Sequence, residues 1–221
     1  MKLHGKLIAT GLCFIFLFIA FTFLVRTDIL RGVDFDITVK LQGRLPERSY
    51  SIFNFISQPV GFFPMTILLI ATFALMRDWI RLIIAFAAYG GGHVLELVGK
   101  LILSQPPPQY MFYKLPTNAW FPNDYRPEGN SYPSGHSFRA FFYAMLLVFI
   151  LMKTDKISRN LKIILVCCIF VVAGIIAVGK IALGQHWATD VIAGFMLGIG
   201  SALTASAIEI NSTRKSIDIK T

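Results

Sequence analysis

Residues 132–137 read Tyr-Pro-Ser-Gly-His-Ser, and from Ser137 an apolar run continues to Met152. A polar, proline-rich stretch therefore becomes an apolar, helix-compatible segment within a few residues. Such a junction exposes the first backbone N–H groups of a helix, which have no partner inside the helix and which bind anions. The junction decides the fold because it turns a loop into a membrane span, with His136 at the start of that span.

Residues 184–190 repeat the arrangement as Gly-Gln-His-Trp-Ala-Thr-Asp, followed by an apolar run to Ile208. His186 thus also stands where a loop meets the start of a helix. Two junctions of this kind in one small membrane protein predict a site for an anionic group.

The composition is that of an integral membrane protein. The chain has 221 residues, of which 55% are hydrophobic, and its mean hydropathy is +0.64. Backbone polar groups inside lipid must be satisfied within the segment that carries them, which favours helices. We therefore expect an all-α, polytopic membrane protein that forms one helical domain over residues 1–221.

Six apolar runs are candidates for spans, each near the ~20 residues that a bilayer requires. The first run is followed by Arg26 and Asp28 and not by a small-residue cleavage site, which favours an uncleaved span over a signal peptide. Residues 32–57 predict an amphipathic segment at the membrane surface, and residues 104–131 an ordered loop at the interface. The expected spans are residues 7–25, 59–76, 79–103, 137–152, 163–178 and 187–208.

The formal net charge is +9, but no basic cluster with interleaved aromatic residues indicates nucleic-acid binding. The short connections on one side of the six spans are rich in Lys and Arg, which places that side in the cytoplasm. We therefore expect a plasma-membrane protein with both termini cytoplasmic and both histidine junctions on the extracytoplasmic side. The remaining basicity suits attraction to anionic membrane lipids.

The two junctions predict phosphoryl chemistry. His186 and Asp190 are four residues apart on one helix face, so the carboxylate can fix the imidazole tautomer and leave the other ring nitrogen as a nucleophile. His136 is a candidate general acid. Ser134 and Gly135 would hold the anion with the first turn of the helix, and Lys100 and Lys180 would add positive charge, making these four the expected phosphate-binding residues.

These residues resemble the type-2 phosphatidic acid phosphatase superfamily. Its pattern is a Lys six residues ahead of Arg-Pro, then Pro-Ser-Gly-His, then Ser-Arg followed by His and Asp. The three elements here are Lys100 with Pro106-Pro107-Pro108, residues 133–136, and residues 179–190. The resemblance implies a nucleophile at His186, an orienting Asp190 and an acid at His136, with no metal and no cofactor.

The sequence departs from the family pattern at both arginines. Pro107 stands in place of the first, and Lys180 replaces the second. The bidentate guanidinium fork that suits phosphate is therefore absent at both positions. Arg126 and Arg139 are auxiliary candidates to supply the missing charge.

The resemblance implies a metal-independent lipid phosphatase that cleaves a lipid phosphate or polyprenyl diphosphate at the outer leaflet through a phosphohistidine. Two alternatives remain open: a lipid phosphotransferase with the same site, and a non-catalytic lipid-binding or transport protein. A zinc site of His136, His186 and Asp190 is a further alternative, although Pro-Ser-Gly-His provides anion-binding amides. A serine hydrolase based on Ser134 would lack the usual Gly-x-Ser-x-Gly elbow.

Several polar and small residues also have structural interpretations. Glu96, a further auxiliary candidate, can form an intrahelical pair with Lys100, Lys180 can extend to the interface, and His93 can be a packing residue. Cys13, Cys167 and Cys168 lie in apolar runs and predict no disulfide. The glycines at 194, 198 and 200 favour close helix packing.

Overall fold

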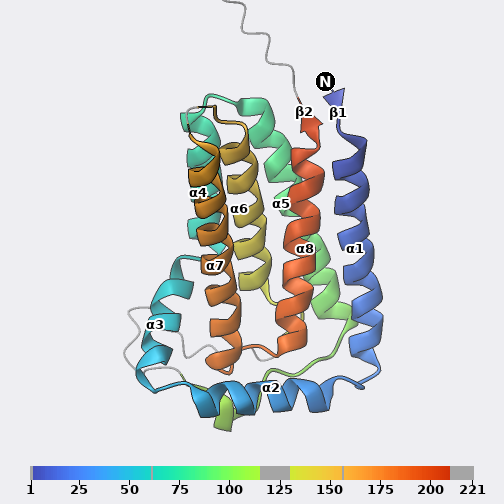
Figure 1. The fold of residues 1–221 in the computed structure, drawn as a ribbon. Coiled ribbons are helices and arrows are strands. Elements are labelled where there is room, and N and C mark those ends of the chain that lie inside the picture. The colour runs from blue at the N-terminus through green and yellow to red at the C-terminus, as the bar shows by residue number, and fades with distance from the viewer. Residues whose placement is uncertain (1, 61, 115–129, 156, 210–221) are drawn as a thin grey trace, which may run out of the picture.

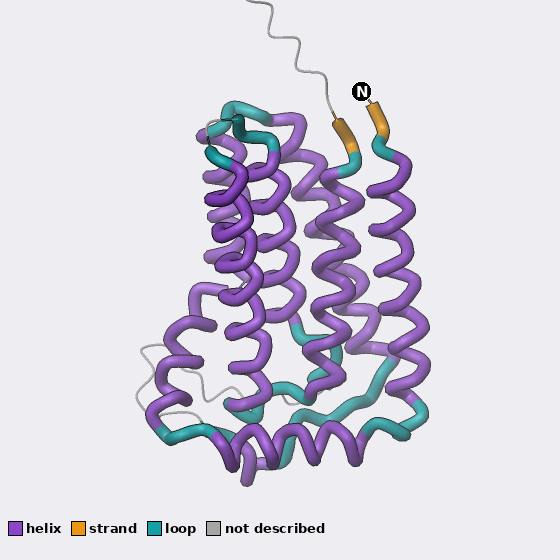
Figure 2. The backbone as a smooth tube through the Cα atoms, in the orientation of Figure 1, coloured by secondary structure: helices purple, strands orange, loops and turns teal. Residues whose placement is uncertain are grey.

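The computed structural model describes residues 2–60, 62–114, 130–155 and 157–209. This part of the chain is almost entirely helical, with the long helices packed side by side as the sequence predicts (Figures 1 and 2). The helices are α1 (Gly5–Arg26), α2 (Arg31–Arg44), α3 (Arg48–Ser57), α4 (Phe62–Leu75), α5 (Trp79–Ile102), α6 (Gly135–Met152), α7 (Arg159–Ala182) and α8 (Ala188–Ser206), with 3-10 turns η1 (Gln58–Val60) and η2 (Tyr110–Phe112) and strands β1 (Lys2–Leu3) and β2 (Ile208–Glu209).

Five helices, α1, α5, α6, α7 and α8, have the length and apolar composition to cross a membrane. The second expected span is shorter than predicted, because α4 has 14 residues. Pro59 lies in η1 and has no N–H with which to continue the hydrogen bonding of α3. In Figure 1, α3 lies below α4 and extends this side of the bundle toward α2.

Helix α8 lies at the centre of the bundle and packs against α1, α5 and α6. Its close approach to α6 depends on glycine. A Cβ on Gly194 would lie 2.4 Å from the Ser134 carbonyl oxygen, and one on Gly198 would lie 2.5 Å from that of Phe138. A Cβ on Gly200 would meet the Gly11 carbonyl oxygen of α1 at 3.0 Å. The predicted packing role of these glycines is therefore confirmed.

The two ends of the described chain meet at one end of the bundle, where β1 and β2 pair antiparallel (Figure 1). Lys2 pairs with Glu209 and Leu3 with Ile208. Helix α2 crosses the opposite end of the bundle, where α6 and α8 begin and where α5 and α7 end. The termini and the two histidine junctions are thus separated by the length of the spans.

The predicted amphipathic segment at 32–57 forms α2 and α3. The polar row of α2 faces the bundle, since Asp34 and Thr38 are buried and Gln42 donates to the carbonyl oxygens of Phe112 (2.7 Å) and Ala182 (2.9 Å). Residues at i, i+4 and i+8 share one helix face. The exposed side of α2 is mixed, because Val33, Phe35, Ile37 and Val39 are exposed together with the ion pair of Asp36 and Lys40. A helix that lies across the end of the bundle with exposed apolar and charged side chains suits the membrane interface.

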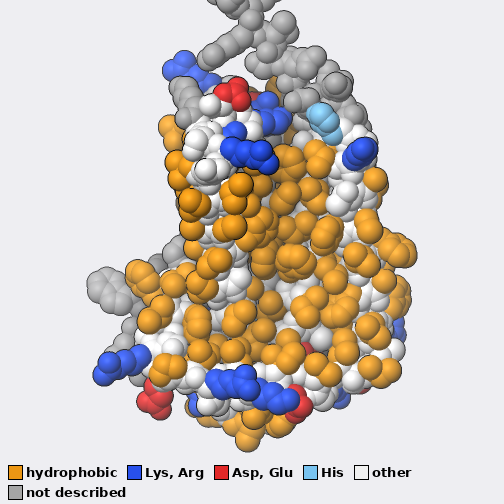
Figure 3. Space-filling view, viewed as in Figure 1, with side chains coloured by type: hydrophobic (Ala, Val, Ile, Leu, Met, Phe, Trp, Pro, Cys, Tyr) orange, Lys and Arg blue, Asp and Glu red, His pale blue; other side chains and the backbone are white. Residues whose placement is uncertain are grey.

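The surface has the character of a membrane protein. Figure 3 shows a broad band of hydrophobic side chains, with Lys and Arg side chains above and below it. The large exposed hydrophobic residues include Phe16 on α1, Leu101 on α5 and Val171 on α7. The chain is a multi-pass membrane protein.

Candidate active site

The two histidine junctions lie side by side. Ser134 N, just before α6, donates a 2.9 Å hydrogen bond to the carbonyl oxygen of Asp190 in the first turn of α8. The close contact of Gly194 with the Ser134 carbonyl holds the two helix starts together. Elements that are about 50 residues apart in the sequence are thereby joined into one site.

The predicted contact of His186 with Asp190 is present, but the prediction that His186 lies in the first turn of the last helix is wrong, because α8 begins at Ala188 and His186 lies in the turn before it. His186 Nδ1 lies 3.3 Å from Asp190 Oδ2, and the same oxygen accepts a 2.9 Å hydrogen bond from Trp187 N. Asp190 is fully buried, whereas the His186 side chain keeps 13% of its surface exposed. The carboxylate therefore fixes the ring from the inside, and the ring remains accessible from outside the bundle.

The turn before His186 is built from the end of α7. The N–H groups of Gln185 and His186 both donate to the Lys180 carbonyl oxygen, at 3.1 and 3.2 Å. Gly184 has φ +66°, a conformation that favours glycine. A Cβ there would also overlap the Phe112 carbonyl. The turn therefore places His186 next to Lys180 at the end of α7.

His136 stands in the first turn of α6 with its side chain partly exposed. Its ring lies in the electrostatic field of Lys180, Arg139, His186 and Lys100. Three basic side chains and both imidazoles therefore occupy one neighbourhood. This is the gathering of positive charge that an anionic substrate requires.

Ser134 is the N-cap of α6. Gly135 has no side chain, so Glu96 of α5 can lie close to the start of α6. Ser134 Oγ accepts hydrogen bonds from Ser137 N (3.4 Å) and Ser137 Oγ (3.2 Å). A Cβ on Gly135 would lie 2.4 Å from Glu96 Oε1. Both residues predicted to bind phosphate thus also have a structural part in the site.

The two lysines are held by neutral oxygen acceptors. Lys100 Nζ donates to the Pro133 carbonyl oxygen at 3.0 Å, and Lys180 Nζ donates to Gln185 Oε1 at 2.8 Å. Lys180 is 4% exposed, so the interpretation that it extends to the interface is wrong. Each ammonium keeps further N–H donors beyond the one bond described.

Glu96 forms the predicted pair with Lys100 and is also the centre of a larger ion cluster. Its carboxylate lies 2.9 Å from His93 Nδ1, 3.7 Å from Lys100 Nζ and 4.0 Å from Arg139 Nη1. Arg139 Nε also donates to the Val60 carbonyl oxygen at 2.8 Å. Arg139 is therefore committed to Glu96 and to η1, although it lies near His136. Arg126 lies outside the described residues.

The segment after α5, where the family pattern has its first arginine, runs along the start of α8. Trp187 Nε1 donates to the Pro106 carbonyl oxygen (2.8 Å), and Gln105 Nε2 donates to Thr189 Oγ1 (3.1 Å). Pro107 lies in this segment, half-buried. The structure thus brings the position to the site, but proline supplies no side-chain donor there.

Asp34 is a residue of the site that the sequence analysis did not identify. Its carboxylate accepts hydrogen bonds from Thr189 N (2.9 Å) and from Thr189 Oγ1 (2.7 Å), next to Asp190. Burial raises the pKa of Asp34, and the bonds from Thr189 oppose that rise. The two residues are 155 positions apart, and the signal in the sequence is the spacing of Asp34, Thr38 and Gln42 along one face of a helix of mixed charge.

Within the described ranges, no group of three or more His, Cys, Asp or Glu side chains is arranged to hold a metal ion. His136, His186 and Asp190 accordingly do not form the three-ligand set considered from the sequence. Cys13, Cys167 and Cys168 are free and exposed on the apolar surface.

Comparison with known families gives one match, over residues 78–214, to the profile described as the PAP2 superfamily. The matched region contains α5 to α8 and both histidine junctions. Phosphatidylglycerophosphatase B of Bacillus subtilis (strain 168) is 35% identical over 74 residues, which cover 31% of this chain and 34% of that protein. The aligned region thus spans about a third of the relative's length.

Two solved structures share the fold. A crystal structure of a transmembrane PAP2-type phosphatidylglycerolphosphate phosphatase from Bacillus subtilis superimposes with a TM-score of 0.71 at 18% identity, covering 89% of this chain and 94% of that one. The crystal structure of LpxE from Aquifex aeolicus gives a TM-score of 0.59 at 19% identity, covering 77% and 93%. At these identities the likeness concerns the arrangement of the helices.

Proposed function

The chain belongs to the PAP2 superfamily, and we propose on this basis that it is a metal-independent phosphatase that hydrolyses a phosphate ester of a membrane lipid. One observation carries the proposal: His186 Nδ1 faces the buried Asp190 carboxylate at 3.3 Å, next to the first turn of α6. A carboxylate on Nδ1 leaves the lone pair of Nε2 for attack on phosphorus.

In the first step, His186 Nε2 forms a bond to phosphorus while the bond from phosphorus to the ester oxygen breaks. His136 gives its proton to the departing oxygen, so the lipid leaves as an alcohol, or as a monophosphate if the substrate is a diphosphate. The product on the protein is a phosphohistidine. Asp190 stabilises the positive charge that the His186 ring acquires.

In the second step, water attacks the phosphohistidine. Neutral His136 takes the proton of that water, the N–P bond breaks, and inorganic phosphate leaves. His186 and His136 then return to their starting protonation states, so the two steps balance.

The expected phosphate-binding groups are Lys100, Lys180, Ser134 and Gly135. Ser137 N and Phe138 N are already satisfied by Ser134, at 3.4 and 3.0 Å. The N–H groups of Gly135 and His136 are the two of the first turn that face a ligand in this proposal. Arg139 and Glu96 act as supports for Lys100 and for the start of α6.

The substrate class in this proposal is a lipid phosphate or polyprenyl diphosphate presented at the extracytoplasmic leaflet, with both termini cytoplasmic. The exposed apolar side chains of α2, which stand beside its charged ones, support this because they lie at the same end of the bundle as His136 and His186. The names of the relatives are consistent with glycerolipid phosphates.

The test is phosphate release from a panel of lipid mono- and diphosphates in detergent with a chelator present. We expect His186→Ala to lower the rate by about 10³-fold or more, as for loss of a nucleophile, and to abolish acid-labile labelling of the protein. Asp190→Asn is a second variant, because asparagine still accepts from Trp187 N but does not hold the imidazolium. His4→Ala, at the far end of the bundle, is the matched control.

Equal phosphate release by the native protein and His186→Ala would contradict the proposal. Transfer of label to an acceptor lipid in place of water would identify a phosphotransferase. Lipid binding without turnover or labelling would identify a non-catalytic member.

A further inference from the structure

A pocket of about 420 Å³ lies at the end of the bundle that carries the termini. Its lining residues come from the ends of α4, α6 and α8 and from the start of α5. Pockets that hold small molecules have volumes of roughly 300–1,000 Å³. The pocket is therefore large enough for a head group with part of a chain, and it is separate from the histidine site at the α2 end.

The walls of the pocket are apolar. Phe73, Ala85, Leu146 and Ala205 are all buried in the bundle and line it. Met76, which lines the pocket, is 43% exposed, and Leu75 before it in the chain is 86% exposed at the end of α4. An apolar cavity that opens beside apolar surface residues is continuous with the region that lipid chains occupy.

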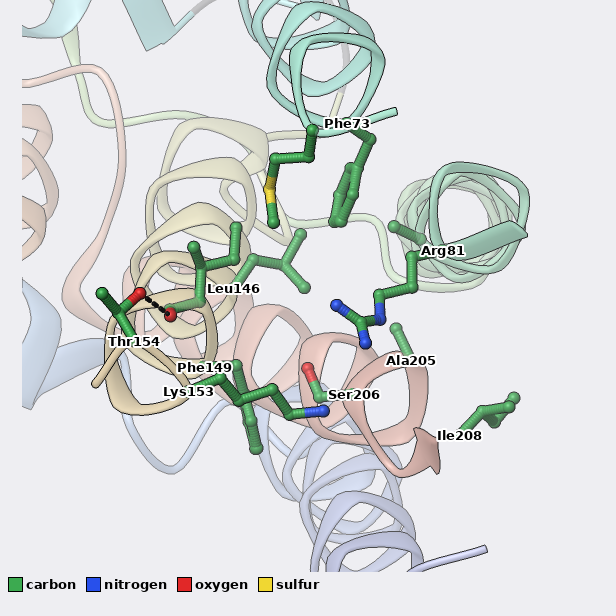
Figure 4. A pocket seen from close by; sticks show the side chains of 12 residues that line it. Phe73, Arg81, Leu146, Phe149, Lys153, Thr154, Ala205, Ser206 and Ile208 are labelled. Atoms are coloured by element: carbon green, nitrogen blue, oxygen red, sulfur yellow. Dashed lines mark hydrogen bonds between the residues drawn. The ribbon is translucent and has the colours of Figure 1, made fainter. Parts of the chain in front are cut away.

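Two basic side chains give the pocket its polarity. In Figure 4, Arg81 and Lys153 reach toward Ser206 from opposite walls. Arg81 Nη1 is 3.1 Å from Asp78 Oδ2, but a guanidinium has five N–H donors in all. Among the described side chains that line the pocket, two are cationic and none is a carboxylate.

Apolar walls together with two cationic side chains favour one class of ligand. A guanidinium and an ammonium placed together match the charge and geometry of a phosphate group. Basic pockets between membrane helices bind the head groups of anionic lipids. A free phosphate would use the two cations but would leave the apolar walls unfilled, whereas a lipid uses both.

We propose that this pocket binds one anionic phosphodiester lipid of the leaflet at the termini end. Its phosphate lies between Arg81 and Lys153, and an acyl chain packs against Phe73 and Leu146. The lipid joins the ends of α4, α5, α6 and α8, and it is held at a site that is independent of the chemistry at His186.

The test is native mass spectrometry of the detergent-solubilised protein titrated with a singly anionic phosphodiester glycerolipid, and in parallel with a zwitterionic phospholipid that has the same chains. The double variant Arg81→Gln/Lys153→Gln is compared with Arg159→Gln/Lys162→Gln, which removes the same charge at the same end of the bundle but outside the pocket. We expect about a fivefold loss of affinity per pocket cation removed, and no loss in the control.

A further variant and a competition experiment complete the test. Ser206→Leu leaves both charges in place and fills the space between them, so it is expected to lose the lipid while its melting temperature without lipid stays close to that of the native protein. Vanadate, a phosphate mimic, is expected to leave the bound lipid in place, because it would compete only at the histidine site.

The proposal is overturned if the zwitterionic lipid binds as tightly as the anionic one, or if vanadate displaces the lipid. It is also overturned if both the pocket double variant and Ser206→Leu bind the anionic lipid like the native protein.

Discussion

Lys180 combines a buried charge with a backbone contact in the site. The ammonium is buried at the end of α7 and donates to Gln185 Oε1 at 2.8 Å. The carbonyl oxygen of the same residue accepts from His186 N. Lys180 therefore contributes to the site twice, through its side-chain charge and through the turn that positions His186.

We predict that Lys180→Met lowers kcat/KM on a lipid phosphate by about 10²–10³-fold, the usual cost of removing one electrostatic donor from an active site. Lys180→Arg is expected to stay within about tenfold of the native kcat/KM, because it keeps the positive charge. A tenfold change corresponds to about 1.4 kcal/mol. The measurement is steady-state phosphate release with melting temperatures for both variants. Unchanged turnover in Lys180→Met would show that this ammonium does not face the phosphate.

At the scale of the element, the contact of α6 with α8 fixes the distance between the two histidine junctions. The contact has no room for a side chain at Gly194, where a Cβ would lie 2.4 Å from the Ser134 carbonyl oxygen. Backbone cannot move aside as a flexible side chain does. A larger residue there must separate the two helix starts.

We predict that Gly194→Ala destabilises the protein by about 1–3 kcal/mol, as overpacking does, and lowers turnover because Ser134 and Asp190 move apart. Gly174→Ala on α7 is the matched control, because nothing lies within 4 Å of its Cβ position. The control is expected to be neutral or stabilising by about 0.5–1 kcal/mol. The measurement is thermal unfolding of both variants in detergent. Equal melting temperatures for Gly194→Ala and Gly174→Ala would contradict the prediction.

Helix α2 is joined to α8 through the hydrogen bonds of Asp34 with Thr189. We predict that Asp34→Ala costs about 1–3 kcal/mol, because Thr189 N and Oγ1 then lose a buried acceptor, and that it also lowers turnover. Asp34→Asn keeps an acceptor for Thr189 N and is expected to lose less in both measurements. If Asp34→Ala unfolds at the native temperature with native activity, α2 is not a support for α8.

The same carboxyl gives the stability a defined pH dependence. Burial raises the pKa of Asp34 above the usual value of 3.8, so the folded state keeps this proton to a higher pH than the unfolded state does. The stabilisation is fully present below pH 3.8 and is lost as the pH rises through the raised pKa. We therefore predict that Asp34→Asn flattens the fall of melting temperature with pH just above that value. Parallel profiles for the two proteins would contradict this.

For the whole molecule, β1 and β2 meet at one end of the bundle and α2 crosses the other. The bias of basic residues in the short connections predicts that the termini end lies in the cytoplasm. We predict that Lys40→Cys on α2 reacts with a membrane-impermeant maleimide in intact cells, and that Lys162→Cys on α7 reacts only after permeabilisation. Lys40 is exposed and Lys162 is partly exposed. Cys13, Cys167 and Cys168 are replaced by alanine beforehand, and the reverse labelling pattern would invert the proposed orientation.

Much of this protein follows from local sequence. Apolar run length sets the α1, α5, α6, α7 and α8 spans, because a bilayer fixes how many residues a helix needs. His186 lies just before Trp187, the N-cap of α8, so its contact with Asp190 comes from the turn that leads into the helix and not from a shared helix face; the sequence predicted the pairing but not this geometry. The small residues of α8 likewise indicate close packing wherever the partner helix lies.

Contacts between distant parts of the chain required the tertiary structure. Asp34 and Thr189 meet because α2 crosses the end of the bundle, and Arg139 is held by Glu96 because α5 packs beside α6. The pocket between Arg81 and Lys153 exists only where four helix ends come together. The sequence by itself determined the α1, α5, α6, α7 and α8 spans and the short spacing of His186 and Asp190, since both depend on residues that are neighbours in the chain. Which charges face each other was decided by packing between helices, where neighbours are set by shape and not by distance along the chain.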